Sequence, residues 1–221
     1  MQFSRLHSWT TSPRAAIALQ QRLRERVVMC ELPADARLVA GVDVAFSRDG
    51  RRVIAGVVVW DRLTARAVQS VAASAPLRFP YVPGLLSFRE IPAMLAAVRK
   101  LTTAPDVFIC DGQGRAHPRR IGLASHFGLW LNRPTVGCAK SHLCGDYDEP
   151  PQRRGSRRAL TIDGETVGAV LRTRDGTKPL FISPGHLSDI ESSVELILAL
   201  APRYRQPEPT RLAHQLVTRA R

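Results

Sequence analysis

The 221-residue sequence predicts an α/β fold, a mixed sheet in which three antiparallel meander strands are continued by parallel strands and flanked by helices. Strand-like apolar runs joined by short turns dominate the first third of the chain. Further strand-like runs then alternate with helical patterns, which favours crossover connections. The length is that of one domain, residues 1–221, and no apolar stretch is long enough to span a bilayer.

The first half of the chain is expected to contain a helix, a meander and a second helix. Ser12 and Pro13 are typical of a helix N-cap and first helical position. Asp49-Gly50 is a hairpin-turn signal between two apolar runs. The expected strands are residues 37–47, 51–61 and 65–74, and after a proline-rich stretch a helix follows over about 88–101.

The second half should alternate strands and helices. The expected elements are a strand at 107–110, a helix at about 119–131, a strand at 134–139, a hairpin of 159–163 and 166–173, a strand at 179–183, a helix capped by Ser188 and a last helix at 210–220. A basic, proline-containing loop, residues 150–158, precedes the hairpin. An antiparallel meander continued by parallel strands through crossover helices is a ribonuclease-H-like topology.

The net charge indicates which class of molecule the protein binds, and the cysteines indicate its cellular compartment. The formal charge of +13 and the pI near 11, carried mostly by arginine, favour nucleic acid over an acidic membrane surface, although an arginine-rich proteome would give the same excess. The four cysteines are scattered without a C-x-x-C pair, which favours reduced thiols in a cytoplasmic protein. Cys138, His142 and Cys144 lack the fourth ligand and usual spacing of a zinc site.

Three acidic residues are the strongest functional signal. Asp43 interrupts one apolar run and Asp111 directly follows another, where a lone carboxylate is unfavourable without compensation. Both should lie at the same edge of the predicted sheet, and Glu90, if it joins them, would add repulsion that Mg²⁺ or Mn²⁺ could offset. Two alternatives remain: Asp111 before a glycine is common turn chemistry, and Ser87 with Glu90 fits a helix capping box.

Longer motifs resemble the endonuclease V family over nearly the whole chain and in the family's order. Gln113 stands where many relatives are expected to have His. The motifs are Val42-Asp43-Val44-Ala45-Phe46, Pro80-Tyr81-Val82-Pro83-Gly84 continuing to Glu90, Asp111-Gly112-Gln113-Gly114, the stretch from His117 to Gly128, Pro134 to Lys140, and Pro207-Glu208-Pro209-Thr210-Arg211.

This resemblance implies a Mg²⁺-dependent DNA repair endonuclease in which Mn²⁺ can replace Mg²⁺. Its substrate would be DNA with deaminated purines, chiefly deoxyinosine, cut at the second phosphodiester bond 3′ to the lesion to leave 3′-hydroxyl and 5′-phosphate ends. Asp43 and Asp111 would be metal ligands, and Glu90, Lys140 and His214 would complete the catalytic set. The alternative is another ribonuclease-H-like nuclease acting on inosine-containing RNA or branched nucleic acid. Neither a membrane nor an obligate protein partner is expected.

Four residues are expected to bind the substrate. Tyr81, framed by Pro80 and Pro83, suits a wedge that fills the gap left by an extruded base, although it could also be a core aromatic. Gly84 allows close approach of backbone to that base. Arg89 is expected to contact phosphate, and His117 either to contact phosphate or to assist proton transfer. Arg89 could equally be an exposed helix-end charge, as Lys140 could simply end a strand in solvent.

Overall fold

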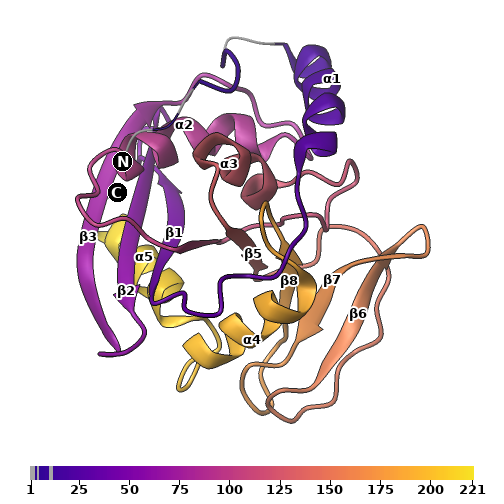
Figure 1. Ribbon diagram of the computed structural model, residues 1–221. Helices are drawn as coiled ribbons and strands as arrows, with labels where there is room; N and C mark the ends of the chain where they lie inside the picture. The colour runs from indigo at the N-terminus through magenta and orange to yellow at the C-terminus, as the bar shows by residue number, and fades with distance from the viewer. Residues whose placement is uncertain (1–2, 4, 10–11) are drawn as a thin grey trace.

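The computed structural model describes residue 3, residues 5–9 and residues 12–221. In this part of the chain, one sheet contains eight strands in the order β3-β2-β1-β4-β5-β8-β7-β6, with helices on both faces (Figure 1). The strands are β1 (Leu38–Phe46), β2 (Arg52–Asp61), β3 (Arg66–Pro76), β4 (Val107–Cys110), β5 (Thr135–Ala139), β6 (Arg157–Ile162), β7 (Glu165–Leu171) and β8 (Leu180–Pro184). The α-helices are α1 (Pro13–Leu23), α2 (Leu86–Val98), α3 (Leu123–Leu131), α4 (Ile190–Leu200) and α5 (Glu208–Arg219), and a 3₁₀ turn, η1 (Arg24–Arg26), follows α1.

The predicted meander is confirmed. β2 pairs antiparallel with β1 along the whole of β1, from Leu38 opposite Asp61 to Phe46 opposite Val53, and β3 pairs antiparallel with β2. The turn between β1 and β2 contains Gly50 at a φ of +67°, a left-handed conformation that glycine adopts without strain. The hairpin signal was therefore sufficient to locate both strands.

The parallel part of the sheet consists of β1, β4 and β5. β4 lies between the other two, and the α2 and α3 segments provide the crossovers. Antiparallel strands continued by parallel ones through helices confirm the ribonuclease-H-like fold. Residues on β4 alternate between the two faces of the sheet, and all are buried, as is usual for a strand covered on both sides.

Beyond β5 the sheet turns antiparallel again. β8 runs antiparallel to β5, β7 antiparallel to β8, and β6 antiparallel to β7. The expected hairpin and the strand near 179–183 are present, so the parallel set ends at β5 and the sheet finishes with a second antiparallel group. A strand-like pattern marks a strand's place but carries no information on its direction.

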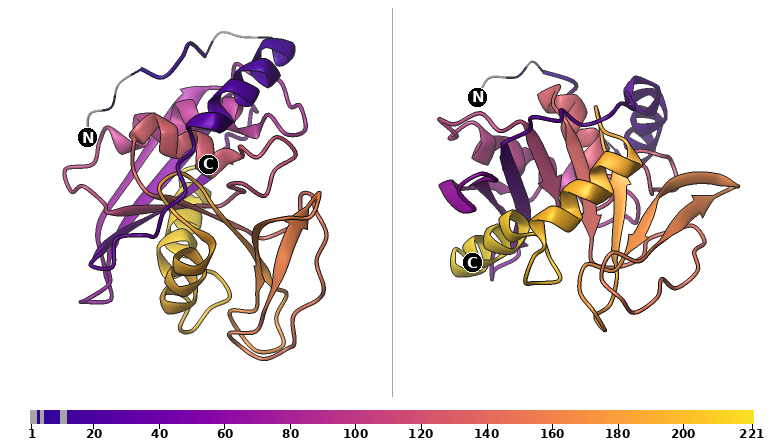
Figure 2. Two further views of the ribbon diagram at one scale, coloured as in Figure 1. Left: turned by 45° about the vertical axis from the view of Figure 1, so that its right-hand side comes forward. Right: turned by 60° about the horizontal axis from the view of Figure 1, so that its bottom comes forward.

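Helices cover the sheet in two layers. The apolar sides of α2 and α3 pack with residues such as Val42 and Phe108, whereas α4 packs with residues such as Ile109 on the opposite face. Helix α5 lies over β1 and β2 (Figure 2). No helix within residues 12–221 has the length and hydrophobicity needed to cross a membrane.

Two of the expected helix caps are wrong. Ser12 does cap α1, because its Oγ accepts from the backbone N–H of Ala15 at 3.3 Å. Ser87, in contrast, lies inside α2, and its Oγ is bonded to Nδ1 of the buried His126 at 2.9 Å, so the predicted capping box with Glu90 does not form. Ser188 Oγ donates to the Thr135 carbonyl at 2.7 Å, and α4 is capped by Asp189. The hydroxyls of Ser87 and Ser188 both bond to residues distant in sequence, so neither caps a helix.

Candidate active site

The register of the parallel strands brings Asp43 and Asp111 together. Val42 on β1 lies opposite Cys110 on β4, so the next residue on each strand is an aspartate at the same edge of the sheet. The backbone N–H of Asp111 donates to the Val42 carbonyl at 3.1 Å, which continues the pairing by one residue. The predicted convergence of these two acids is therefore present in the structure.

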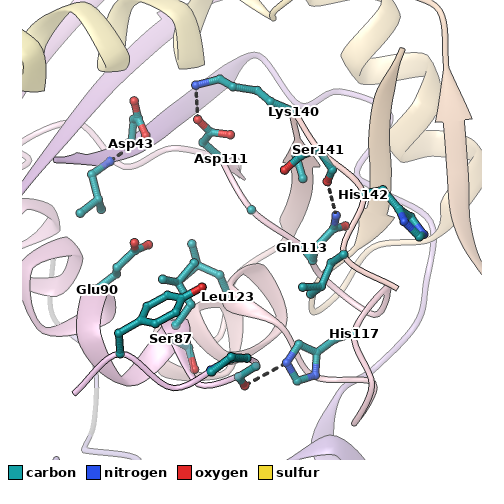
Figure 3. A pocket seen from close by; sticks show the side chains of 18 of the residues that line it. Asp43, Ser87, Glu90, Asp111, Gln113, His117, Leu123, Lys140, Ser141 and His142 are labelled. Carbon is teal, nitrogen blue, oxygen red and sulfur yellow. Dashed lines mark hydrogen bonds and ion pairs between the residues drawn. The ribbon is translucent and has the colours of Figure 1, made fainter. Parts of the chain in front are cut away.

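Each aspartate has a cationic or potentially cationic partner. Asp43 Oδ1 accepts from the Val44 backbone N–H at 2.8 Å, and Oδ2 lies 2.7 Å from Nδ1 of His214. Asp111 forms an ion pair with Nζ of Lys140, which directly follows β5 (Figure 3). The structure thus gathers four of the five predicted catalytic residues into two neighbouring pairs.

Glu90 reaches the same site from α2. Its side chain is buried, and burial, followed by the negative charges of Asp43 and Asp111, raises its pKa to about 8. Burial also raises the pKa of Asp111, against the lowering effect of Lys140. The three carboxyl groups therefore share a site with less positive charge than they need to ionise together.

A glycine allows α5 to bring His214 to the aspartates. A Cβ on Gly41 would lie 2.1 Å from the backbone carbon of Pro209, so only glycine permits this approach of the helix start to β1. His214 then lies on the helix face turned toward Asp43, with about half of its side chain exposed.

A cavity of about 420 Å³ opens beside the three acids. Figure 3 shows Asp43, Glu90 and Asp111 on one side and His117 with Gln113 on the other. Tyr81 lines the cavity from the loop before α2 and is 72% exposed, so it is not the core aromatic considered above. The remaining wall includes Val82 to Gly84, Leu86, Ser87, Gly112, Leu123 and residues 139–143.

Gly84 is the anchor of the Tyr81 loop. It has a φ of +77°, and its carbonyl accepts from Gln20 Nε2 at 3.0 Å, His117 Nε2 at 3.0 Å and Arg119 Nη2 at 2.8 Å. His117 Nδ1 accepts from the Arg119 backbone N–H, so the proton of the neutral ring is on Nε2. Burial, and then the charge of Arg119, lower the pKa of His117 to about 4.

Two arginines, Arg89 and Arg120, lie in different surroundings. Arg89 Nη1 donates to the Phe79 carbonyl at 3.1 Å, and its guanidinium lies over the rings of Phe46 and Tyr81. Arg120 pairs with Glu165 at 2.8 Å, away from the carboxyl cluster. Contact of Arg89 with phosphate stays a prediction.

The donors suit a hard divalent cation. Mg²⁺ typically takes one or two protein carboxylates together with waters and substrate oxygens, which Asp43 and Asp111 can supply. In the described part of the chain, no three His, Cys, Asp or Glu side chains form a complete metal-binding group. Burial, and then the charges of Asp43 and Asp111, raise the pKa of Glu90, so a cation placed among the three carboxyl groups would favour their ionised forms, and the residues present fit such an ion.

Two contacts of the cavity wall were not anticipated. Gln113 Nε2 donates to the Ser141 carbonyl at 3.2 Å and ties the Gly-rich turn to the 139–143 segment. That segment contains Lys140 and begins at the last residue of β5, so its position next to the carboxyl groups could be inferred from the end of the strand. Gln20, in contrast, bonds a carbonyl 64 residues away, and nothing in the pattern of the first helix signals that contact.

The chain matches known proteins of one family over nearly its whole length. The family model described as Endonuclease V matches residues 21–215. The Endonuclease V of Nostoc punctiforme is 46% identical over 219 residues, 99% of this chain and 99% of that protein. The crystal structure of Endonuclease V from Streptomyces avermitilis has a TM-score of 0.91 at 44% identity and covers 96% of this chain and 94% of that one.

A more distant structure shares the fold. Ciona intestinalis Endonuclease V, crystallised in complex with a DNA containing an inosine followed by a ribo-adenosine, has a TM-score of 0.81 at 23% identity, covering 94% of this chain and 96% of that one. Because the family model spans most of the sequence and relatives match it nearly from end to end, this chain belongs to the Endonuclease V family.

Proposed function

We propose that this protein is a DNA repair endonuclease that recognises deaminated purines, chiefly deoxyinosine, and hydrolyses the second phosphodiester bond 3′ to the lesion. In the reaction, the oxygen of water bonds to phosphorus and the bond from phosphorus to the 3′ oxygen breaks. The products are a 3′-hydroxyl and a 5′-phosphate. The observation that carries the proposal is the Asp43–Asp111 pair beside a cavity edged by the exposed Tyr81.

Asp43 and Asp111 are the residues that would hold Mg²⁺, or Mn²⁺ in its place. When bound, the ion would supply Lewis acidity toward the phosphate and lower the pKa of a water. Two carboxylates on adjacent strands, one within β1 and one directly after β4, are both largely buried and provide the oxygen donors that such an ion prefers. His214 orients Asp43 through the Nδ1 contact, which fixes the carboxylate that the ion would use.

Lys140 and Glu90 would act on the phosphate and on the charge of the site. The Lys140 ammonium lies at the pocket wall beside Asp111, where it would offset negative charge gathering on the scissile phosphate. Glu90 faces Asp43 and Asp111 from α2, and its ionisation depends on how much positive charge the site contains. We assign Glu90 to positioning the ion or its water.

The cavity and the Tyr81 loop would bind the lesion. A base must leave the stack for an enzyme to read all its edges, and a cavity of about 420 Å³ lies within the size range of small-ligand pockets, about 300–1,000 Å³. Tyr81 would fill the gap in the stack. Gly84 brings backbone close to the base, and His117 serves binding by holding the Gly84 carbonyl in place.

The overall charge supports a nucleic-acid partner. A net charge of +13 favours phosphate contacts and rapid electrostatic association. The four cysteines are free thiols in the structure, and two of them are buried, which is consistent with our proposal of a cytoplasmic location.

A substrate panel tests this function. Purified protein is incubated with end-labelled duplexes that differ at one position, adenine or hypoxanthine, with Mg²⁺ or with chelator, alongside an inosine-containing RNA and a branched DNA. We expect metal-dependent cleavage of the hypoxanthine duplex and not of its matched control. Preference for the RNA or the branched substrate would overturn the DNA lesion assignment in favour of the alternative nuclease function.

A further inference from the structure

The Arg89 side chain lies between two aromatic rings at the edge of the cavity. Its Cζ is 5.1 Å from the centroid of Phe46, the last residue of β1, and 5.7 Å from the centroid of Tyr81. Both distances are within the range of a cation–π contact, about 6 Å. The sheet, the helix α2 and the Tyr81 loop therefore meet at one guanidinium.

The polar atoms of Arg89 are directed into the protein. Nη1 donates to the carbonyl of Phe79, a buried residue two positions before Tyr81. Nε is buried and has no hydrogen-bond partner within the described residues. The guanidinium therefore has one N–H bonded to a backbone carbonyl, its Nε buried and two aromatic rings beside it. In this arrangement it cannot readily offer two N–H groups to one phosphate.

Among the described residues, Arg89 makes the one ring contact found for Tyr81. The side chain is 72% exposed, at the tip of a loop that Gly84 anchors three residues later. An aromatic wedge that rotates freely loses conformational entropy on insertion, whereas a ring already held in one orientation loses less. The contact with Arg89 supplies that restraint from the rigid helix side.

We propose that Arg89, packed on Phe46, is a positioning residue that holds the Tyr81 ring in the orientation used for insertion, and thereby sets discrimination between lesion-containing and matched DNA. The inference rests on the proposed function, because it needs Tyr81 to be the wedge. It differs from the phosphate-clamp role in a measurable way. A residue that positions Tyr81 affects binding only through the Tyr81 ring. A residue that contacts phosphate affects the affinity for lesion-containing and matched DNA alike.

Two substitutions separate these roles. Arg89→Lys keeps the positive charge near Glu90 but removes the planar fork, so we expect discrimination for inosine-containing over matched duplex to fall about three- to thirtyfold. Arg89→Met keeps an apolar stem and removes the charge. If Arg89 contacts no phosphate, the slope of log affinity against log salt stays unchanged, whereas loss of a phosphate contact lowers its magnitude by about 0.9.

Binding is measured by fluorescence anisotropy in chelator, so cleavage does not enter. In a double-mutant cycle, Arg89→Lys should reduce discrimination in the wild-type background and have almost no effect in Tyr81→Ala. Arg99→Lys is the matched control, since Arg99 lies at the other end of α2 with its Cζ 4.8 Å from the Phe3 ring centroid. It should leave discrimination unchanged.

A spectroscopic measurement makes the test independent of DNA. The sequence has three tyrosines, Tyr81, Tyr147 and Tyr204, so fluorotyrosine labelling gives three ¹⁹F signals that Tyr→Phe variants assign. Arg89→Lys should shift and broaden the Tyr81 signal alone. Tyr204 serves as an internal reference, because its ring centroid lies 4.3 Å from the Cζ of another arginine, Arg211.

The outcomes distinguish the two proposals. An unchanged Tyr81 signal, an effect of Arg89→Lys that persists in Tyr81→Ala, or a reduced salt slope in Arg89→Met would each overturn the positioning role. If Tyr81→Ala itself leaves discrimination intact, the wedge assignment fails, and with it the premise of this inference.

Discussion

Replacing His117 with glutamine should make the protein less sensitive to acid. In the folded protein His117 is buried, donates through Nε2 to the Gly84 carbonyl, and has a pKa of about 4 compared with the usual 6.5. Between those values the unfolded chain binds a proton that the folded one does not. Stability therefore falls as the pH drops from about 6.5 to about 4 and is unaffected above that window.

The magnitude follows from the difference between the two pKa values. At roughly 1.4 kcal/mol for each pH unit, a change from 6.5 to about 4 corresponds to a loss of about 3 kcal/mol across the window. Glutamine can keep a donor near the Gly84 carbonyl but does not titrate. His117→Gln should thus remove about 3 kcal/mol of the acid-induced loss, although the buried His126, whose pKa burial also lowers, still contributes to the rest.

Urea unfolding measured at intervals from about pH 8 to about pH 4 tests this expectation. Wild type, His117→Gln and His142→Gln are compared, because His142 is an exposed histidine on the same side of the cavity. The His142 variant should follow the wild type. If His117→Gln loses as much stability as the wild type over the window, His117 is not the buried, neutral anchor of Gly84, and this reading of the Tyr81 loop is wrong.

Three further outcomes are expected. Asp43→Ala or Asp111→Ala should abolish cleavage while leaving affinity for inosine-containing DNA largely intact, since affinity comes mainly from basic groups and the base pocket; strong Mg²⁺-dependent cutting by either variant would remove it from the ligand set. Glu90→Gln should lower turnover severely. It should not cost the stability of about 1 kcal/mol that a broken helix cap would cost, because the capping box is absent; thermal unfolding and cleavage rates, measured on the same variant, test this. Tyr81→Ala should reduce discrimination roughly ten- to hundredfold in binding titrations and Tyr81→Phe only slightly, and equal losses on matched and inosine-containing duplexes would contradict the wedge role.

Much of the geometry of the carboxyl groups was predictable because two local signals and one topological rule were enough. Asp43 interrupts an apolar strand and Asp111 ends another, and parallel strands joined by crossovers place such ends at one edge. Lys140 was assigned to the site only through the family resemblance, although it directly follows β5, the next strand of that edge. The hairpin turn at Asp49-Gly50 fixed the first pairing.

Other features depend on contacts that no short window of sequence contains. Ser87 has the right neighbours for an N-cap, but a histidine 39 residues away takes its hydroxyl. The three donors on the Gly84 carbonyl come from two segments that are distant from it in sequence and meet only in the folded chain. The antiparallel direction of β8 could not be predicted from the sequence either, because an apolar strand can pair with its neighbour in either direction.

The most direct test of the central claim is to map the cut. A duplex with one hypoxanthine, labelled at the 5′ end of the lesion strand, is digested with Mg²⁺ and run beside a single-nucleotide ladder, and the labelled product is tested for extension by a polymerase while the unlabelled product is tested for a 5′-phosphate by ligation. The account predicts a single cut at the second phosphodiester bond 3′ to the lesion, an extendable 3′-hydroxyl, a ligatable 5′-phosphate, and no product with Asp43→Ala. Cleavage at the lesion itself, release of the free base, or cutting that ignores the hypoxanthine would contradict it.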